Sequence, residues 1–295
     1  MRPGVLSFAP RRPDGPAPLF CDAALAARVE LAEVRLITEV SAATRGRRGD
    51  TAGFVIPIAG GVASFAEVAS PFNKIAGLGF GEAPSVAELG EIERAFAAFS
   101  APVQVELPHL ADPAVGSLLT GRGYRLVSFE NVLGRALDGA TAHAPPAGIA
   151  IRASGPDEYD QWLDVMADAV AHADDQGVPS HEDFPRDAVV GAMRDLTTGP
   201  GVTRYAAVRD GLLAGGASLR MTTGLAQLTG AATAPVHRRR GIQTALLAAR
   251  IADAAAAGCD VAVVTTQPGS KSQQNAQRAG FDLLYTRAIL VKEVA

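Results

Sequence analysis

The spacing of apolar and polar positions predicts an alternation of strands and helices in the second half of the chain. Short apolar runs with strand spacing predict strands at residues 149–152, 204–208, 212–222, 225–233, 261–266 and 281–292. Apolar positions with helical spacing predict helices at residues 156–171, 185–196 and 242–257, and a short helix that ends at Gly280. Local signals agree with these bounds, because Arg209-Asp210-Gly211 is typical of a hairpin and Gly258 of a helix end.

The first half repeats part of this pattern. The segment Gly123-Tyr124-Arg125-Leu126-Val127 matches Gly280-Phe281-Asp282-Leu283-Leu284 position for position. A strand, a helix, a strand and another helix precede each copy. In the first half these four elements are expected at residues 73–80, 86–99, 103–106 and 113–120. The agreement of element order with residue pattern favours an internal duplication.

A segment of small, polar and proline residues separates the two halves. Residues 136–148 read ALDGATAHAPPAG, a composition typical of a linker. We therefore expect two domains, at residues 1–140 and 149–295, joined by a linker at 141–148. The alternation of strands and helices in both places the protein in the mixed α/β class.

Composition describes a globular protein and excludes several partners. Hydrophobic residues make up 48% and charged residues 20% of the 295 residues, and the net charge of −4 gives no general attraction to nucleic acid or to an anionic membrane. The N-terminal segment lacks the apolar core of a signal peptide, and no apolar run approaches spanning length. The two cysteines, Cys21 and Cys259, exclude a disulfide framework and a cysteine zinc site. We expect a cytoplasmic bacterial protein, either a monomer or a homodimer.

The most informative segment for chemistry is Arg238-Arg239-Arg240-Gly241-Ile242-Gln243-Thr244. It lies between the predicted strand 225–233 and an alanine-rich helix. A helix start exposes unpaired N–H groups, glycine permits close approach, and guanidinium groups match phosphate oxygens. Three consecutive arginines repel one another at the positive end of a helix, so an anionic partner is favoured over simple solvation. The segment therefore predicts a binding site for a pyrophosphate.

The order of motifs around this segment resembles the GCN5-related N-acetyltransferases (GNAT). Their acyl-CoA site has the signature [QR]-x-x-G-x-[GA], which Arg238 and Gly241 match, while Gln243 replaces the small sixth residue. The usual phosphate-binding and dinucleotide signatures, GxxxxGK[ST] and GxGxxG between strand and helix, do not occur. Thr233-Ala234-Pro235 stands where the family ends a strand with V-x-P, and Gly280-Phe281 stands at its glycine-aromatic close. The resemblance covers residues 149–293 well and the first half only in element order.

The resemblance implies a fold, a cofactor and a reaction. It implies two GNAT-like domains, each with a mostly antiparallel twisted sheet and a parallel strand–helix–strand crossover at the acyl-CoA site. Acetyl-CoA would be the acyl donor, no metal would be needed, and a small-molecule amine would attack the thioester directly without an acyl-enzyme. The residues expected to bind the cofactor are Ala231, Ala232, Thr233, Arg238, Arg239, Arg240, Gly241, Ile242, Gln243, Thr244 and Asn275.

The sequence offers few candidates for proton transfer. Many members of the family carry a carboxylate on the strand before the pyrophosphate loop, where this chain has Gln227 and Thr229, and a tyrosine where it has Ala276. The candidates are therefore Tyr285 for the thiolate side and Glu182, with His181, for the amine side. A buried strand residue is the simpler account of Tyr285, and a solvated loop explains Glu182 and His181 equally well. The acidic residues Asp174, Asp175, Glu182 and Asp183 favour a cationic acceptor.

The first half has no counterpart to the arginine segment. At the corresponding place stands Gly81-Glu82-Ala83-Pro84-Ser85, where Glu82 would repel a pyrophosphate. We therefore expect a degenerate GNAT-like domain that does not bind coenzyme A. Two alternatives to an enzyme stay open. The missing carboxylate and tyrosine also fit a non-catalytic acyl-CoA-binding sensor or regulatory protein, and the loss of both sites would leave an interaction protein.

Overall fold

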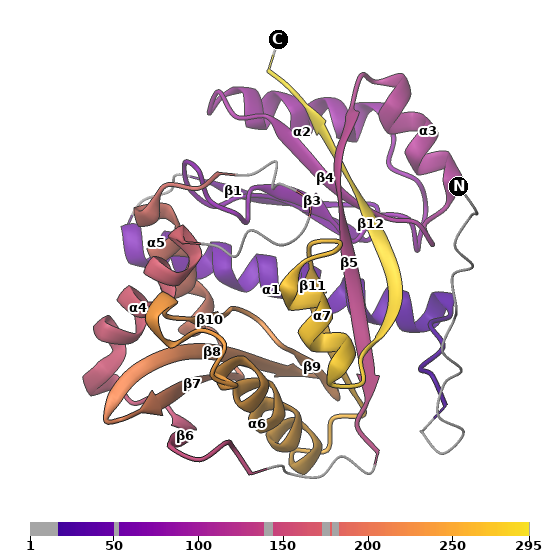
Figure 1. Ribbon diagram of the computed structural model, residues 1–295. Helices are drawn as coiled ribbons and strands as arrows, with labels where there is room; N and C mark the ends of the chain where they lie inside the picture. The colour runs from indigo at the N-terminus through magenta and orange to yellow at the C-terminus, as the bar shows by residue number, and fades with distance from the viewer. Residues whose placement is uncertain (1–16, 50–52, 139–143, 173–177, 179–182, 295) are drawn as a thin grey trace, which may run out of the picture.

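The computed structural model describes residues 17–49, 53–138, 144–172, 178 and 183–294. Within them, twelve strands form one continuous sheet (Figure 1). The strands are β1 (Phe54–Ile58), β2 (Gly61–Phe65), β3 (Lys74–Ala76), β4 (Val103–Pro108), β5 (Arg125–Ala136), β6 (Ile149–Ala153), β7 (Val202–Arg209), β8 (Leu212–Thr222), β9 (Leu225–Gln227), β10 (Ala231–Thr233), β11 (Val261–Thr266) and β12 (Asp282–Lys292). The α-helices are α1 (Ala23–Arg48), α2 (Val86–Ala97), α3 (Pro113–Gly121), α4 (Tyr159–Ala171), α5 (Arg186–Thr197), α6 (Ile242–Ala256) and α7 (Lys271–Arg278).

The strand order shows that the two halves exchange their last strands. Along the sheet the order is β1-β2-β3-β4-β12-β5-β11-β9-β8-β7-β6, with β10 paired to β8. The last strand of the second half, β12, pairs with β4, and the last strand of the first half, β5, pairs with β11. The two exchanged strands also pair with each other in the middle of the sheet (Figure 1). The halves therefore share one sheet, and the division at residues 141–148 stays a prediction about the sequence.

The predicted fold class is confirmed in both halves. Most pairings are antiparallel, and the two exceptions are β3 with β4 and β9 with β11. A helix connects the strands of each parallel pair, α2 in the first half and α6 in the second, as a parallel connection requires. The matching order of elements on the two sides of the β5–β12 pair agrees with the predicted duplication.

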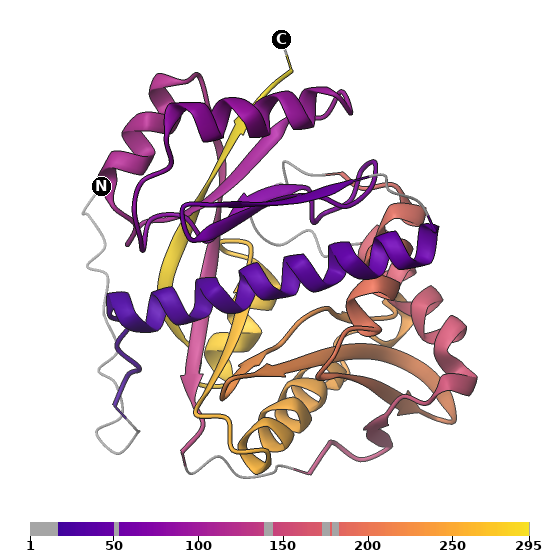
Figure 2. The ribbon, with the colours of Figure 1, turned by 180° about the vertical axis from the view of Figure 1, so that it is seen from behind.

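The sequence analysis missed helix α1, which is the longest element of the protein with 26 residues. It crosses the face of the sheet opposite to α6 and α7 (Figures 1 and 2). Its start is clear, because the Asp22 side chain accepts a hydrogen bond from the Leu25 N–H at 2.8 Å. The buried polar residues Glu30, Ser41 and Thr44 interrupt its apolar positions, so the sequence shows no continuous apolar stripe that would predict the helix.

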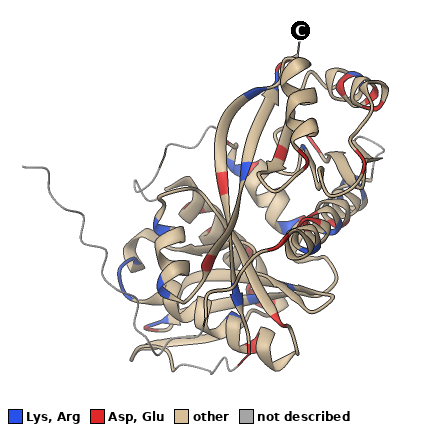
Figure 3. Cartoon of the chain, turned by 90° about the vertical axis from the view of Figure 1, so that its right-hand side faces the viewer, with Lys and Arg blue, Asp and Glu red and all other residues tan. Residues whose placement is uncertain are grey.

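Ion pairs join α1 to the second half at several places along its length. Arg28 pairs with Asp260 before β11, Glu39 with Arg220 on β8, and Arg47 with Asp195 on α5. Charges of both signs are interspersed over the two halves, in keeping with the small net charge (Figure 3). None of the helices in the described ranges combines the length and the apolarity needed to cross a bilayer.

The packing of α4 on the sheet gives a test of the fold. Trp162 of α4 is 1% exposed, and its indole N–H donates to the Tyr205 carbonyl at 2.9 Å. A Cβ at Gly216 of β8 would clash with this indole nitrogen and stand 3.0 Å from the Met166 sulfur. We expect Gly216→Ala to lower the free energy of unfolding by about 1–3 kcal/mol, because overpacking moves the indole. Urea denaturation measures the loss.

The matched control for this substitution is Gly121→Ala at the end of α3, where a Cβ meets nothing within 4 Å. It should be neutral or stabilising by up to about 1 kcal/mol. Equal effects of the two substitutions would contradict the tight contact between Gly216 and Trp162.

Candidate functional site

The predicted strand at residues 225–233 is broken into two strands, and the break opens the sheet. β9 pairs in parallel with β11 up to Gln227, and the Leu228 N–H donates to the Val263 carbonyl at 2.9 Å. After Leu228 the chain leaves β11, and β10 pairs only with β8. A gap therefore separates β10 from the end of β11.

Backbone groups on both sides of this gap lack strand partners. Hydrogen-bonded residues alternate along an antiparallel pair. Gly230 and Ala234 bond to β8, through the Ser218 N–H at 2.9 Å and the Ala214 carbonyl at 3.0 Å. It follows that the N–H and C=O groups of Ala231 and Thr233 point away from β8 and toward the gap. An extended chain lying there would complete the sheet by hydrogen bonding to them.

Arg250 of α6 lies beside the break between β9 and β10 and donates hydrogen bonds to the backbone there. Its side chain is 3% exposed, and one guanidinium nitrogen lies 3.1 Å from the Ser218 carbonyl and 3.5 Å from the Thr229 carbonyl. Burial lowers the pKa of Arg250 to about 10, and no carboxylate among the described residues pairs with it. The positive charge under the strand break favours negative charge in the adjacent gap.

The start of α6 offers a row of backbone donors. Gly241 is the N-cap with φ of 85°, and no side chain caps the helix. Arg239 also has a positive φ, 59°, a strained conformation for a residue with a Cβ. Across the described ranges, the N–H groups of residues 239–244 have no acceptor within hydrogen-bonding distance. This geometry fits an anion, as the sequence predicted.

The corresponding helix of the first half has a different start. Ser85 caps α2 by accepting from the Glu88 N–H at 3.1 Å, and the Glu88 carboxylate accepts from the Ser85 N–H at 2.7 Å. This capping box occupies the donors that an anion would need and places a carboxylate beside them. The prediction that the first half lacks an anion site therefore has a structural reason.

The three arginines have different surroundings. The Arg238 guanidinium donates to the carbonyls of Ala169 and His172 at the end of α4, so its hydrogen bonds hold this loop against α4. The Arg238 guanidinium is therefore engaged by α4, and the binding of the cofactor by this residue stays a prediction. Arg239 and Arg240 are exposed beside the free N–H groups of α6.

Several buried polar atoms around the gap have no hydrogen-bond partner. They are Thr233 Oγ1 on β10, His237 Nδ1 before α6, Gln243 Oε1 on α6 and Thr266 Oγ1 at the end of β11. Buried polar atoms are rarely left unpaired in proteins, so their gathering at one place indicates a ligand site. Asn275 is half-buried on α7, which packs against α6 and β11.

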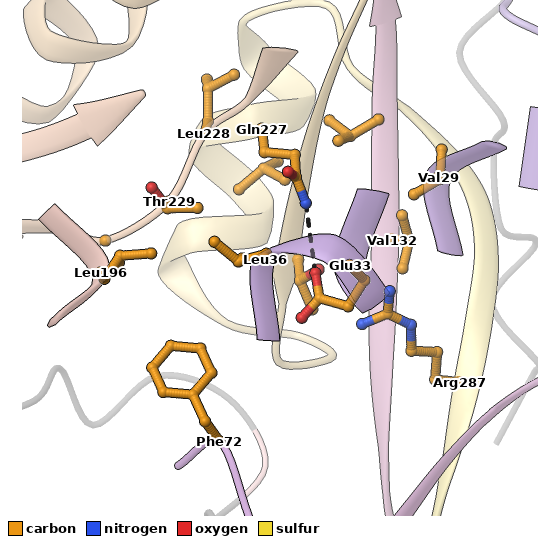
Figure 4. Close-up of a pocket in the computed structure, with 14 residues that line it drawn as sticks. Val29, Glu33, Leu36, Phe72, Val132, Leu196, Gln227, Leu228, Thr229 and Arg287 are labelled. Atoms are coloured by element: carbon orange, nitrogen blue, oxygen red, sulfur yellow. Dashed lines mark hydrogen bonds between the residues drawn. The ribbon is translucent and has the colours of Figure 1, made fainter. Parts of the chain in front are cut away.

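A cavity of about 230 Å³ lies at the strand break and is lined in part by the first half. Its walls on the second half come from β9, from Leu228, Thr229 and Gly230 of the break, and from β11. The first half contributes Val29, Glu33 and Leu36 of α1, with Phe72 and Val132, and the remaining walls include Leu196 and Arg287 (Figure 4). The first half therefore shapes the cavity.

Glu33 points into this cavity toward Gln227 (Figure 4). Its carboxylate accepts from the Gln227 Nε2 at the long distance of 3.5 Å, while the Gln227 Oε1 accepts from Arg220 at 2.5 Å. Gln227 stands on the strand where the GNAT resemblance places a carboxylate. The structure thus supplies a carboxylate at this place from another element, α1, which the sequence analysis missed.

Of the two predicted catalytic residues, the structure describes Tyr285, which does not line the cavity. Tyr285 is 1% exposed, and its hydroxyl donates to the Glu30 carboxylate at 2.6 Å. Burial, and then the nearby Glu30 charge, raise the pKa of Tyr285 far above its usual value. The expectation that Tyr285 protonates a thiolate is therefore corrected. Glu182 and His181 lie outside the described residues.

Comparisons with known proteins agree with this geometry. Residues 167–281 match the model of the acetyltransferase (GNAT) family, a range that includes β10, α6, β11 and α7. No curated protein sequence matches significantly. A GCN5-related N-acetyltransferase from Kribbella flavida has a similar structure, with a TM-score of 0.65 at 19% identity over 91% of this chain and 95% of that chain.

Two further solved structures have a fold similar to that of this chain. A GCN5-related N-acetyltransferase from Sphaerobacter thermophilus gives a TM-score of 0.54 at 17% identity, over 91% of this chain and 93% of that chain. A tandem GNAT protein from the clavulanic acid biosynthesis pathway gives 0.60 at 14% identity, over 94% of this chain and 98% of that chain. At these identities the likeness concerns the fold. Residues 167–281 therefore match a GNAT domain, and the fold of the whole chain is similar to that of a tandem GNAT protein.

The residues at the gap fit coenzyme A. The free N–H groups at the start of α6 suit its pyrophosphate, and the free strand edges suit its amide-bearing pantetheine arm. The unpaired Thr233, Gln243 and Thr266 oxygens supply further polar partners. No cluster of histidine, cysteine or acidic residues in the described ranges has a metal-binding arrangement.

Proposed function

We propose that this protein is an acetyl-CoA-dependent N-acetyltransferase whose acceptor is a small-molecule amine. The observation that carries the proposal is the uncapped start of α6 beside the open edges of β10 and β11. In the first half, the corresponding helix α2 starts with a side-chain cap instead. One coenzyme A site per chain follows.

The arrangement supports direct transfer of the acetyl group. The pyrophosphate would bind to the N–H groups of residues 239–244, and the pantetheine arm would lie between β10 and β11. The thioester would then lie at the strand break, where the cavity at Thr229 and Gly230 gives an amine access. Backbone N–H groups at the break would polarise the thioester carbonyl, and holding both reactants together supplies much of the acceleration.

Calorimetry with acetyl-CoA and a thiol-release assay across an amine panel test this function. We expect one molecule bound per chain and release of free thiol that depends on the amine. Binding of two molecules per chain would contradict the assignment of α2 as a capped, inactive counterpart. The absence of any binding would remove the proposal.

The sensor alternative retains one supporting observation. Ala276 stands where many members of the family have the tyrosine proton donor, and Tyr285 does not replace it. Stoichiometric binding without turnover on any amine would favour the sensor over the enzyme.

A further inference from the structure

The cavity at the strand break is lined by two ionisable side chains, Glu33 and Arg287. Arg287 is 2% exposed and bonds Glu30 at 2.8 Å and Glu106 at 3.2 Å, so its charge is neutralised outside the cavity. Glu33 has one hydrogen bond in the described part of the chain, the 3.5 Å contact with Gln227. The carboxylate of Glu33 is therefore the proton acceptor that the cavity offers to an incoming amine.

The geometry points to Glu33 of α1 as the general base of acetyl transfer, acting on a compact primary amine with a hydrocarbon body. This inference rests on the proposed acetyltransferase function and names its base and its acceptor class. It also gives the degenerate first half a catalytic role, because that half supplies α1 across the shared sheet.

Acetyl transfer removes two protons from the acceptor nitrogen. The ammonium group of the acceptor gives one proton to Glu33 and becomes a neutral amine. Its lone pair forms the C–N bond with the thioester carbonyl carbon, and the C–S bond breaks. The second proton lost by the nitrogen ends on the coenzyme A sulfur, and Glu33 releases its proton to solvent. The products are the acetamide and free coenzyme A.

The walls of the cavity define the acceptor class. Val29, Leu36, Phe72, Val132 and Leu196 present hydrocarbon surface, which favours an apolar body. The volume of about 230 Å³ is below the roughly 300–1,000 Å³ typical of drug-sized ligands, so the body must be compact.

The charges near the cavity disfavour an acceptor that carries a carboxylate. Glu33 would repel it, and the one cation in the wall, Arg287, already pairs with Glu30 and Glu106. An ammonium group is attracted by Glu33 at the same place. The acceptor is therefore a monoamine without an acid group.

Two matched pairs of amines test the acceptor class. Phenethylamine differs from phenylalanine, and isoamylamine from leucine, by one carboxylate. We expect kcat/KM for each monoamine to exceed that for its amino acid at least 10-fold, and to exceed that for spermidine. Preference for the amino acids or for the polyamine would overturn the acceptor class while leaving acetyl transfer in place.

Glu33→Gln tests the general base, with Glu91→Gln on the exposed face of α2 as the matched control. At pH 7 we expect Glu33→Gln to lower kcat/KM about 100-fold, the usual effect of losing a general base, and Glu91→Gln to change it less than 3-fold. The Kd for acetyl-CoA should stay within 3-fold in both variants, which also reports that Glu33→Gln folds. Glu33→Asp keeps the carboxylate and should retain more activity than Glu33→Gln.

The pH profile distinguishes a base from a structural role. The charged groups facing Glu33 are Glu30 of its own helix, Lys74 of β3 and Arg287 of β12. As the pH approaches 10, near the usual pKa of an alkylamine, the free amine needs no base. The deficit of Glu33→Gln should then shrink below 10-fold, whereas a constant deficit would overturn the role of Glu33.

The outcomes of these experiments distinguish the proposed acetyltransferase function from the inference about Glu33. A wild-type protein that does not bind acetyl-CoA removes the proposed function. A wild-type protein that binds acetyl-CoA and acetylates amines, with Glu33→Gln equally active at pH 7, removes only the inference about the base.

Discussion

Gly241→Asp should raise the Kd for acetyl-CoA at least about 100-fold, which corresponds to about 2.7 kcal/mol of binding free energy. Three effects act together at this position. A side chain at φ of 85° strains the loop, a Cβ would approach the Pro146 Cγ to 3.0 Å, and the carboxylate would repel the pyrophosphate from the α6 N–H groups. Calorimetry measures the change.

Gly258→Asp is the matched control at the other end of the same helix. Gly258 has a similar φ of 81°, and a Cβ there meets nothing within 4 Å. The two variants carry the same charge and a similar backbone strain, yet Gly258→Asp should change the Kd less than 3-fold. If both variants bind acetyl-CoA as tightly as the wild type, the start of α6 is not the pyrophosphate site.

The second large effect is expected at Arg287 of β12. Its guanidinium bonds the buried carboxylates of Glu30 on α1 and Glu106 on β4, and Lys74 bonds the same Glu106 at 2.5 Å. Although burial alone would lower the pKa of Arg287, the Glu30 charge raises it well above normal. Arg287→Leu leaves two buried carboxylates with one cation fewer. We expect it to lower the free energy of unfolding by about 3–5 kcal/mol.

Lys292→Leu on the same strand provides the comparison. Lys292 pairs with Glu93 at 2.8 Å near the surface, and such pairs contribute about 1 kcal/mol or less. Denaturation followed by circular dichroism measures both variants. A loss below about 1 kcal/mol for Arg287→Leu would show that the buried cluster does not hold the exchanged strands.

The sequence and the structure agree best where the signal is local. Gly241, its flanking arginines and the helix behind them predicted a helix start that binds an anion, and α6 begins there without a cap. The Ser85 and Glu88 pair was missed as a capping box, although its spacing is a readable signal that α2 satisfies its own N-terminus.

The disagreements all concern contacts between distant segments. The sequence predicted that Tyr285 lies on a strand. Only the fold shows that its hydroxyl donates a hydrogen bond to Glu30, 255 positions away in the chain. The break at Leu228–Gly230 depends on β8 and Arg250, so the pattern that predicted one strand over residues 225–233 could not reveal it. The hairpin of β1 and β2 was likewise missed, since short strands carry few pattern positions, whereas β3 lies within the strand predicted at residues 73–80.

By itself the sequence determined the fold class and the helix start at Gly241, and it predicted the GNAT resemblance and the donor site, because helix starts, turns and apolar periodicity are set by residues close together in the chain. The tertiary structure decided where the last strand of each half pairs and which helix covers the strand break. Those outcomes depend on burying β5, β12 and α1 against partners more than a hundred residues away. Glu33 reaches the cavity through that packing alone, so the acceptor side of the site became visible only in the folded protein.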